Sequence, residues 1–543
     1  MEELEEDRLS SLPKIVLHRI LSRLPEEDAA RTSALSKAWL DTWYTFPILS
    51  FTASKFMEMS PEQPMEYIRM EESERMRKTL GFCNYVKRSI LRFRDQNLAI
   101  KEFKLKMNSS NLRRISKDVD IWLKLACECG VEVIEYNQMV SVGYIGPRRY
   151  HVLPICVIEA KSITKLVLKG YIKIDPTFMN HSIKFTSLRV LSLLDVLLGD
   201  QHAINHLISF CPLIESITLS CCVIGSGDGT KEKLKSLSIS GLQKLKSVEA
   251  IGIQDVSFNA PSLETLCYSP IYFYAQLKID FDSCRNLKEL SMWSITSTFF
   301  TDKWFLEQFP KFPFVESLKL RYCKMSERIN ISSVRLKVLE LSHCSNLKEV
   351  NIDAPNLLSC EYRGDGASEP TISFLRNSSQ LEVNIHLNLW HLDLCNLWEF
   401  MQNIKPNNVL TSLSLRIHCP SNVAALDTVA LQISSLPPSI KHLDVDCVSQ
   451  NIDCVSENKH WFLSVVNILL SCCCPANISF SVHSHSKEFI ELFYETLMRR
   501  KEDECFCTSD NTTCWWHGLK DLKVTSSMEM NRDVFSLCIS RNY

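Results

Sequence analysis

Few side chains in this sequence are spaced as catalytic chemistry requires. Residues 225–231 (GSGDGTK) place three glycines before a lysine, but they lack the G-x-x-x-x-G-K-[ST] spacing with which a loop surrounds a nucleotide's phosphates. Asp444 and Asp446 could serve as paired carboxylates for acid–base chemistry, yet they alternate along an expected strand and no histidine is spaced to join them. The sequence therefore predicts no catalytic residue and a protein that is not an enzyme.

A metal site is the second chemical possibility, because the C-terminal part is rich in cysteine and histidine. Cys505, Cys507, Cys514 and His517 lie within thirteen residues. Structural zinc sites usually present C-x2-4-C pairs separated by a longer loop, which C-x-C-x6-C-x2-H does not match. We therefore expect a cysteine-bearing loop here, with neither a bound metal nor another cofactor.

Composition and charge narrow the class of partner. The 543 residues are 45% hydrophobic and 23% charged, an ordinary globular composition with enough chain for more than one domain. A formal net charge of −2 lacks the basic footprint of proteins that bind nucleic acid or anionic membranes, so the expected partner is another protein. The acidic start and the lack of an 18-residue apolar run favour a soluble protein of the nucleus and/or cytoplasm, whose 23 cysteines stay reduced.

The first fifty residues carry the signals of two or three short helices. Leu17, Ile20, Leu21 and Leu24 have the i, i+3, i+4, i+7 spacing of one helical face. A second helix is expected after Pro25, where three acidic residues would meet the positive end of its dipole. About forty residues bury too little surface to be stable alone. Some of this apolar surface must therefore pack on something else, either the rest of the chain or a partner.

The same residues resemble a plant F-box. The resemblance rests on Leu12-Pro13, Ile20-Leu21-Ser22, Leu24-Pro25, Leu35-Ser36-Lys37 and Trp39. It implies that residues 1–50 dock on the Skp-family adaptor of a cullin–RING ubiquitin ligase. The residues that the resemblance assigns to adaptor binding are Leu12, Pro13, Leu17, Ile20, Leu21, Leu24, Pro25, Leu35 and Trp39. Two departures leave open whether this F-box binds the adaptor. Ala38 stands where F-boxes commonly have arginine, and F-boxes often have a lysine near the position of Glu27.

Residues 51–99 are expected to form a linker and a helical cap. Leu80, Cys83, either Val86 or Lys87, Ile90 and Phe93 approximate helical spacing. The surrounding sequence is locally basic, and neither interleaved aromatic residues nor a base-reading motif accompanies the charges. The prediction is an amphipathic helix with a solvated cationic face.

From residue 100 onward the chain repeats a phrase with apolar residues at positions 1, 4 and 6, such as Leu188, Leu191 and Leu193. Intervals of 20 to 32 residues are typical of leucine-rich repeats, in which each phrase supplies one strand of a curved parallel sheet. Residues 100–543 are therefore assigned to leucine-rich repeats, weaker and irregular after about residue 370. The expected fold is α/β: a short N-terminal helical F-box followed by a curved solenoid with its parallel sheet inside and helices or loops outside.

Cysteine at position 9 extends three of the phrases, at Cys222, Cys323 and Cys344. This is the repeat pattern in which a small polar side chain hydrogen-bonds buried backbone as the chain leaves the strand. Between phrases, residues 119–130 and 202–212 have helical spacing and end in glycine or proline, which predicts helices on the outer side.

The alternation of a strand implies that positions 3, 5 and 7 of each phrase face outward from the sheet, where they would bind a target protein. Candidate target-binding residues at these positions are Trp293, Lys319, Arg321, Glu340, Arg416 and Asp444. The echo NAPSLETLCY and DAPNLLSCEY extends the resemblance to plant F-box/leucine-rich-repeat proteins, FBD-related ones included, over nearly the whole chain.

Three functions follow from this resemblance. The first is a target-recognition subunit of a Skp–cullin–F-box ubiquitin ligase. The second is a protein-interaction scaffold whose altered F-box no longer engages the adaptor. The third is a small-molecule receptor of the F-box/leucine-rich-repeat type, which would need a lined pocket and clustered lysines and arginines on the inner face, and the sequence shows no such cluster.

Overall fold

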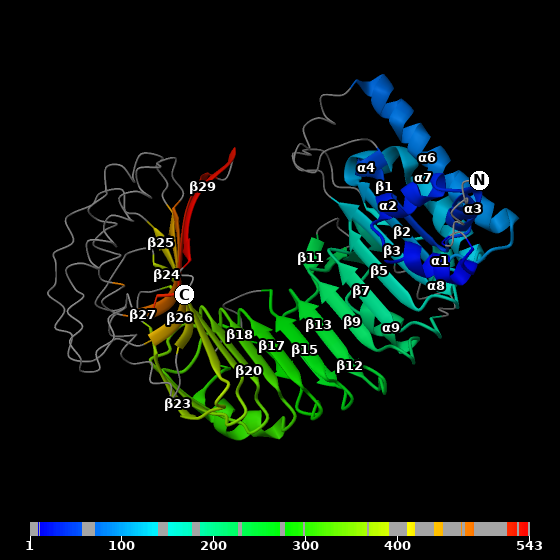
Figure 1. Ribbon diagram of the computed structural model, residues 1–543. Coiled ribbons are helices and arrows are strands. Elements are labelled where there is room, and N and C mark those ends of the chain that lie inside the picture. The colour runs from blue at the N-terminus through cyan, green and yellow to red at the C-terminus, as the bar shows by residue number, and fades with distance from the viewer. Residues whose placement is uncertain are drawn as a thin grey trace, which may run out of the picture. The chain divides into compact units, whose positions relative to one another are not determined.

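The structure is a computed structural model, shown in Figure 1. It describes residues 9, 11–56, 71–139, 150–175, 185–225, 231–271, 277–296, 299–365, 369–389, 410–418, 439–448, 469, 473–482, 519–528 and 531–540. The chain divides into two compact units, residues 1–272 with 277–284 and residues 273–276 with 285–543. No helix in the described part is both long enough and apolar enough to cross a membrane.

Unit 1 begins with a helical module, defined as residues 11–47. Its three α-helices are α1 (Lys14–Leu21), α2 (Glu26–Arg31) and α3 (Lys37–Tyr44). Pro13 and Pro25 immediately precede α1 and α2, and the Ser36 hydroxyl caps α3 by accepting the Trp39 backbone N–H at 3.3 Å. The module has its own core, made of Leu17, Leu21, Ala29, Trp39 and Phe46.

The strand that leaves the module is the first strand of the unit 1 sheet. β1 (Ile48–Thr52) pairs in parallel with β2 (Glu102–Asn108), and the Pro47 carbonyl accepts the N–H groups of Lys101 at 2.8 Å and Glu102 at 3.1 Å. β1 thus crosses the boundary that the sequence placed at residue 50. In-register parallel pairing continues through β3 (Val133–Met139), β5 (Lys165–Gly170), β7 (Val190–Leu194), β9 (Ser216–Ser220), β13 (Ser247–Ile251) and β15 (Thr265–Ser269).

A long amphipathic helix, α6 (Glu72–Asp95), follows β1, as the sequence predicted, but its buried face differs from the expected one. Leu80 is exposed and Cys83 half-buried. The buried face consists of Phe82, Val86, Ile90 and Phe93, together with small polar residues. α6 packs against α7 (Ser109–Glu128), where the rings of Phe82 and Trp122 meet edge to face at 6.0 Å.

Unit 2 continues the same construction with longer strands toward its C-terminal end. Its parallel strands are β17 (Glu289–Trp293), β18 (Ser317–Arg321), β20 (Val338–Ser342), β22 (Ser359–Gly364), β24 (Glu382–Leu389), β25 (Leu410–His418), β26 (Ser439–Val448), β27 (Cys474–Val482) and β28 (Asp521–Met528). The last strand, β29 (Asn531–Ser540), runs antiparallel to β28 and so does not add another repeat.

The repeat phrase is confirmed by burial. Phrase positions 1, 4 and 6 are buried wherever their exposure is described, as for Leu287, Leu290 and Met292. One phrase is misplaced: Leu237 and Ile239 lie on β12 (Ser236–Ser240), which pairs with β14 (Asp255–Asn259) in a separate sheet. The strand of the main sheet at this point is β13, which the sequence pattern missed.

Helices cover the outer side of only some repeats. α7 and α9 (Ala203–Ser209) lie where outer helices were expected. Elsewhere, phrases close in sequence, such as those starting at Leu336 and Leu357, leave too few residues for a helix and two turns. There the chain returns through short strands that form second parallel sheets, including β19 (Arg328–Ser332), β21 (Glu349–Asp353) and β23 (Thr371–Arg376).

A repeated turn closes several of the inner strands. The residue at phrase position 8 has left-handed backbone, with φ of 57° at Asp195, 54° at Tyr322 and 49° at His343. Its N–H donates to a carbonyl of the next strand, for example Tyr322 to Ser342 at 2.8 Å and His343 to Arg363 at 2.7 Å. In these repeats the turn therefore ties the strand end to its neighbour and fixes the register of the side chains beside it.

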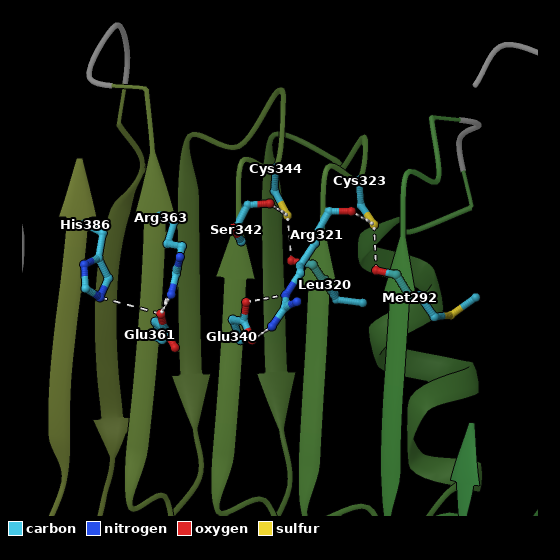
Figure 2. Close-up of polar contacts among 10 residues, drawn as sticks. All are labelled: Met292, Leu320, Arg321, Cys323, Glu340, Ser342, Cys344, Glu361, Arg363 and His386. Atoms are coloured by element: carbon cyan, nitrogen blue, oxygen red, sulfur yellow. Dashed lines mark hydrogen bonds and ion pairs between the residues drawn. The ribbon is translucent and has the colours of Figure 1, made fainter. Parts of the chain in front are cut away.

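Cysteine follows this turn at position 9 in three repeats. Cys323 Sγ donates to the Met292 carbonyl and Cys344 Sγ to the Leu320 carbonyl, both at 3.4 Å (Figure 2). Cys222 Sγ makes the matching contact to the Leu193 carbonyl. The role expected from the repeat pattern is confirmed. These thiols satisfy buried carbonyls, and burial raises their pKa values.

Candidate protein-binding site

Some of the residues predicted to bind the adaptor are buried inside the helical module. Leu17, Leu21 and Trp39 are at most 4% exposed in the module's own core, while Leu12 and Ile20 are half-buried against it. The assignment of Leu17, Leu21 and Trp39 to a partner surface is therefore corrected, because their side chains are already packed. The helical spacing identified an apolar face of the module, but it did not show whether that face is covered by the module itself or by a partner.

A second apolar set on the module stays exposed, and we call it the exposed apolar set: Ile15, Val16, Leu24, Leu35 and Leu40. Leu24 and Leu35 were predicted for this role, as were the exposed prolines 13 and 25. Ile15, Val16 and Leu40 were missed, although α1 carries apolar residues on both sides of Leu17, which is a visible signal. Five large apolar side chains left exposed on so small a module favour a protein-binding surface.

Packing against the rest of unit 1 does not use the exposed apolar set. The module is joined there through β1 and through Tyr44, whose ring lies 4.6 Å from the Arg92 guanidinium on α6. Leu35 remains 68% exposed after these contacts. The alternative that the module packs only onto the rest of the chain therefore leaves this surface unexplained.

The inner strands of unit 2 present phrase positions 5 and 7 on one face, which we call the displayed face. Register aligns Trp293, Arg321 and Ser342 in one row, and Lys319 and Glu340 in the adjacent row. Trp293, Lys319 and Arg321 are half-exposed as predicted, but Glu340 is only 4% exposed. Glu340 is therefore not a free recognition residue, contrary to the sequence prediction.

Glu340 is buried by an arginine of the preceding strand. Arg321 Nε and Nη2 donate to its two carboxylate oxygens at 2.5 and 2.8 Å (Figure 2). The same guanidinium lies 5.3 Å from the Trp293 ring centre. Trp293 Nε1 is buried and has no hydrogen-bond partner among the described residues. Three of the predicted target-binding residues thus form one connected cluster.

Farther along unit 2, a second group gathers around Glu361. Arg363 Nη2 lies 2.5 Å and His386 Nε2 3.6 Å from the same Glu361 oxygen. Figure 2 shows the Arg363 side chain reaching this oxygen along the same strand, β22, and the His386 side chain reaching it from the neighbouring β24. Burial and, secondarily, the Arg363 charge lower the pKa of His386. The histidine is therefore mainly neutral near pH 7.

Arg363 and His386 of this group line a pocket of about 400 Å³ on the displayed face. Arg416 and Asp444, both predicted from the sequence, lie in its wall. The histidines of the pocket were missed because they occupy the turn at position 8 or a strand whose phrase is weak. The lining residues are His343, Arg363, Gly364, His386, Leu387, Asn388, Ser414, Leu415, Arg416, Asp444 and Asp446.

The other chemical possibilities raised by the sequence find no site in the described residues. Residues 225–231 connect two antiparallel strands, β10 (Val223–Gly225) and β11 (Lys231–Lys233), and do not lead into a helix; residues 226–230 lie outside the described residues. Residues 505–517, with the candidate zinc ligands, also lie outside them. Within the described part, no three acidic, histidine or cysteine side chains are grouped to hold a metal ion.

Comparison with known proteins assigns both parts of the chain. Residues 9–51 match the F-box domain model. Residues 119–301 match the LRR repeats of the FBD-associated F-box protein At5g56370, and residues 276–506 match the LRR domain of At1g61320/AtMIF1. In both parts the chain is similar to plant F-box/leucine-rich-repeat proteins. Its repeats and helical module thus correspond to the two characteristic parts of these proteins.

Relatives of this chain occur in Arabidopsis thaliana. It is 28% identical over 239 residues to the F-box/FBD/LRR-repeat protein At5g56420, covering 43% of this chain and 49% of the relative. It is 28% identical over 264 residues to the putative FBD-associated F-box protein At5g50270, covering 48% and 57%. The F-box/LRR-repeat protein At1g48400 is 27% identical over 308 residues, with 54% and 56% covered. The matched regions span about half the length of these relatives.

Proposed function

We propose that this protein is the target-recognition subunit of a Skp–cullin–F-box E3 ubiquitin ligase. The helical module docks on the Skp-family adaptor, which links the chain to the cullin and RING subunits, and the displayed face binds a target protein. The chain performs no chemistry of its own. It raises the effective concentration of target lysines near the ubiquitin-conjugating enzyme. The complex acts in the nucleus and/or cytoplasm.

The observation that carries this proposal is the exposed apolar set on a module matched as an F-box. Its five side chains remain exposed although the module has already completed a core and joined unit 1. Covering such a side chain fully is worth about 1.5–3 kcal/mol relative to leaving it in water. A partner that covers the set therefore gains enough free energy to bind stably.

A co-elution experiment tests the docking. The full-length chain is mixed with purified Skp-family adaptor, cullin and RING subunits, and the complex is separated by size. We expect the wild type to elute with all three and a Leu35→Asp variant to elute alone. Leu375→Asp is a matched control, because Leu375 is 63% exposed on β23 and belongs to unit 2, not to the module. Co-elution of Leu35→Asp with the adaptor would contradict the proposed docking.

The non-ligase scaffold is the alternative, and one observation bears on it. Ala38 is exposed on α3, where F-boxes commonly have arginine, so the module lacks a charge that could meet the adaptor. If the scaffold interpretation is correct, the wild type does not co-elute with the adaptor and Ala38→Arg restores co-elution. The small-molecule receptor is not favoured, because Arg321, Arg363 and Arg416 on the displayed face are each paired with a carboxylate.

A further inference from the structure

The pocket on the displayed face has the size and position of a site for part of a bound segment. Its volume of about 400 Å³ lies in the lower part of the range for ligand pockets, ~300–1,000 Å³. Its walls come from the C-terminal halves of neighbouring strands, β22, β24, β25 and β26. An extended segment crossing these strands can place one or two side chains in it.

The two arginines of the pocket are already neutralised. Arg363 pairs with Glu361 at 2.5 Å, and Arg416 Nε donates to Asp446 at 3.0 Å. The Arg363–Glu361 pair lies along one strand, β22, and the Arg416–Asp446 pair joins the neighbouring strands β25 and β26. An anionic ligand would therefore have to displace a carboxylate to reach either guanidinium, which disfavours phosphates and acidic side chains.

Asp444 is the uncompensated charge. It is exposed on β26 and has no ion pair or hydrogen bond among the contacts of the described residues. Register places Ser414 beside it and His386 one strand farther. Because its pKa is lowered, His386 is mainly neutral and does not balance the charge of Asp444. At the rim of the pocket, His343 Nδ1 lies 2.8 Å from another carboxylate, that of Asp365. The carboxylates around the pocket thus outnumber its guanidinium groups.

We propose that this pocket receives a lysine or arginine side chain of the target protein. The cationic group pairs with Asp444, while the Ser414 hydroxyl and the neutral His386 ring provide further hydrogen-bonding atoms. This inference deepens the proposed function and rests on it, since it supplies the chemistry by which the displayed face selects a target. The target segment is therefore basic at the position that enters the pocket.

Peptide binding to the full-length chain tests this selection without the adaptor. Four fluorescein-labelled peptide pools share randomised flanks and differ in one fixed central residue: arginine, lysine, norleucine or glutamate. Norleucine matches the aliphatic part of lysine without the charge. By fluorescence anisotropy, we expect the arginine or lysine pool to bind at least tenfold more tightly than the norleucine pool, and the glutamate pool to bind most weakly.

Substitutions at the pocket assign the preference to Asp444. Asp444→Asn keeps the size of the side chain and should reduce the preference for basic peptides about tenfold, and Asp444→Lys should make the glutamate pool the tightest. Glu307→Gln, at an exposed position of the short helix Trp304–Gln308 and outside the pocket lining, should leave the preference unchanged. The proposal is overturned if basic and norleucine pools bind equally or not at all, or if Asp444→Asn keeps the full preference. Adaptor co-elution of the same samples reports separately on the docking.

Discussion

Arg321 and Glu340 form a two-point ion pair across adjacent strands of unit 2. Nε and Nη2 of the guanidinium donate to the two carboxylate oxygens at 2.5 and 2.8 Å, and the pair leaves Glu340 almost completely covered. The guanidinium also lies against the Trp293 ring. The displayed face therefore contains a fixed, charge-balanced cluster at Arg321 and an uncompensated carboxylate at Asp444, and only the second is available to a charged ligand.

Glu340→Gln should destabilise unit 2. The variant leaves a half-buried guanidinium without its charged partner, which costs about 1–3 kcal/mol. Urea denaturation followed by tryptophan fluorescence measures the loss of stability. Glu316→Gln is the control, because Glu316 pairs with Lys337 at 2.7 Å on an exposed surface, where removing the charge should leave the midpoint unchanged. Equal effects of the two substitutions would show that burial of the Arg321–Glu340 pair contributes nothing.

The module's core and its exposed surface should respond differently to the same substitution. Leu17→Ala removes a buried side chain and should destabilise the module by about 2–5 kcal/mol, whereas Leu35→Ala should change its stability by less than about 0.5 kcal/mol. Amide hydrogen exchange of α1 and α3 in the full-length chain measures both. Faster exchange in Leu35→Ala than in Leu17→Ala would contradict the division between core and surface.

Two glycines in left-handed backbone should tolerate alanine unequally. A Cβ at Gly170, with φ of +92°, would overlap the backbone oxygen of Gln138, whereas a Cβ at Gly130, with φ of +71°, meets nothing within 4 Å. Gly130→Ala should therefore cost about 1 kcal/mol of backbone strain, and Gly170→Ala should cost several-fold more. Thermal unfolding of the two variants compares them. A smaller loss at Gly170 would show that the β3–β5 packing is looser than described.

The buried thiols should make stability fall at alkaline pH. Burial raises the pKa of Cys222 to about 12, whereas a thiol in the unfolded chain ionises near ~8.5. Between these values the unfolded state releases a proton that the folded state keeps, so each such thiol lowers the free energy of unfolding by about 1.4 kcal/mol per pH unit. Urea denaturation of reduced protein from pH 8 to 10 should show a shallower decline for Cys222→Ala. Parallel slopes for variant and wild type would exclude this contribution.

The repeat architecture was readable because every inner strand must bury alternate residues. Leu290 and Met292 satisfy this directly, and so do most other phrases. The pattern failed at β13, because its apolar residues end in the small Ala250 and its flanking residues are polar. The more leucine-rich β12 was therefore predicted as the inner strand of this repeat. It also missed β27, where a proline, Pro475, replaces the first apolar residue although Ile478 and Phe480 follow at positions 4 and 6.

The binding surfaces were less predictable, because they depend on contacts between distant segments. Leu17 and Leu35 are the same residue type in the same short module, and only the fold distinguishes a core position from an exposed one. Glu340 was expected to face solvent, but the strand register brings Arg321 over it. Asp444 and Arg416 could be predicted because a residue at position 5 or 7 of a phrase must lie on the displayed face. This holds even where the side chains that contact it cannot be read from the sequence.

Affinity for the Skp-family adaptor tests the central claim most directly. The full-length chain is titrated with purified adaptor by isothermal calorimetry, beside the Leu35→Asp and Leu375→Asp variants. The proposed docking predicts saturable binding by the wild type and by Leu375→Asp, with at least a hundredfold loss for Leu35→Asp. Absence of binding by the wild type, or equal affinities of all three proteins, would contradict it.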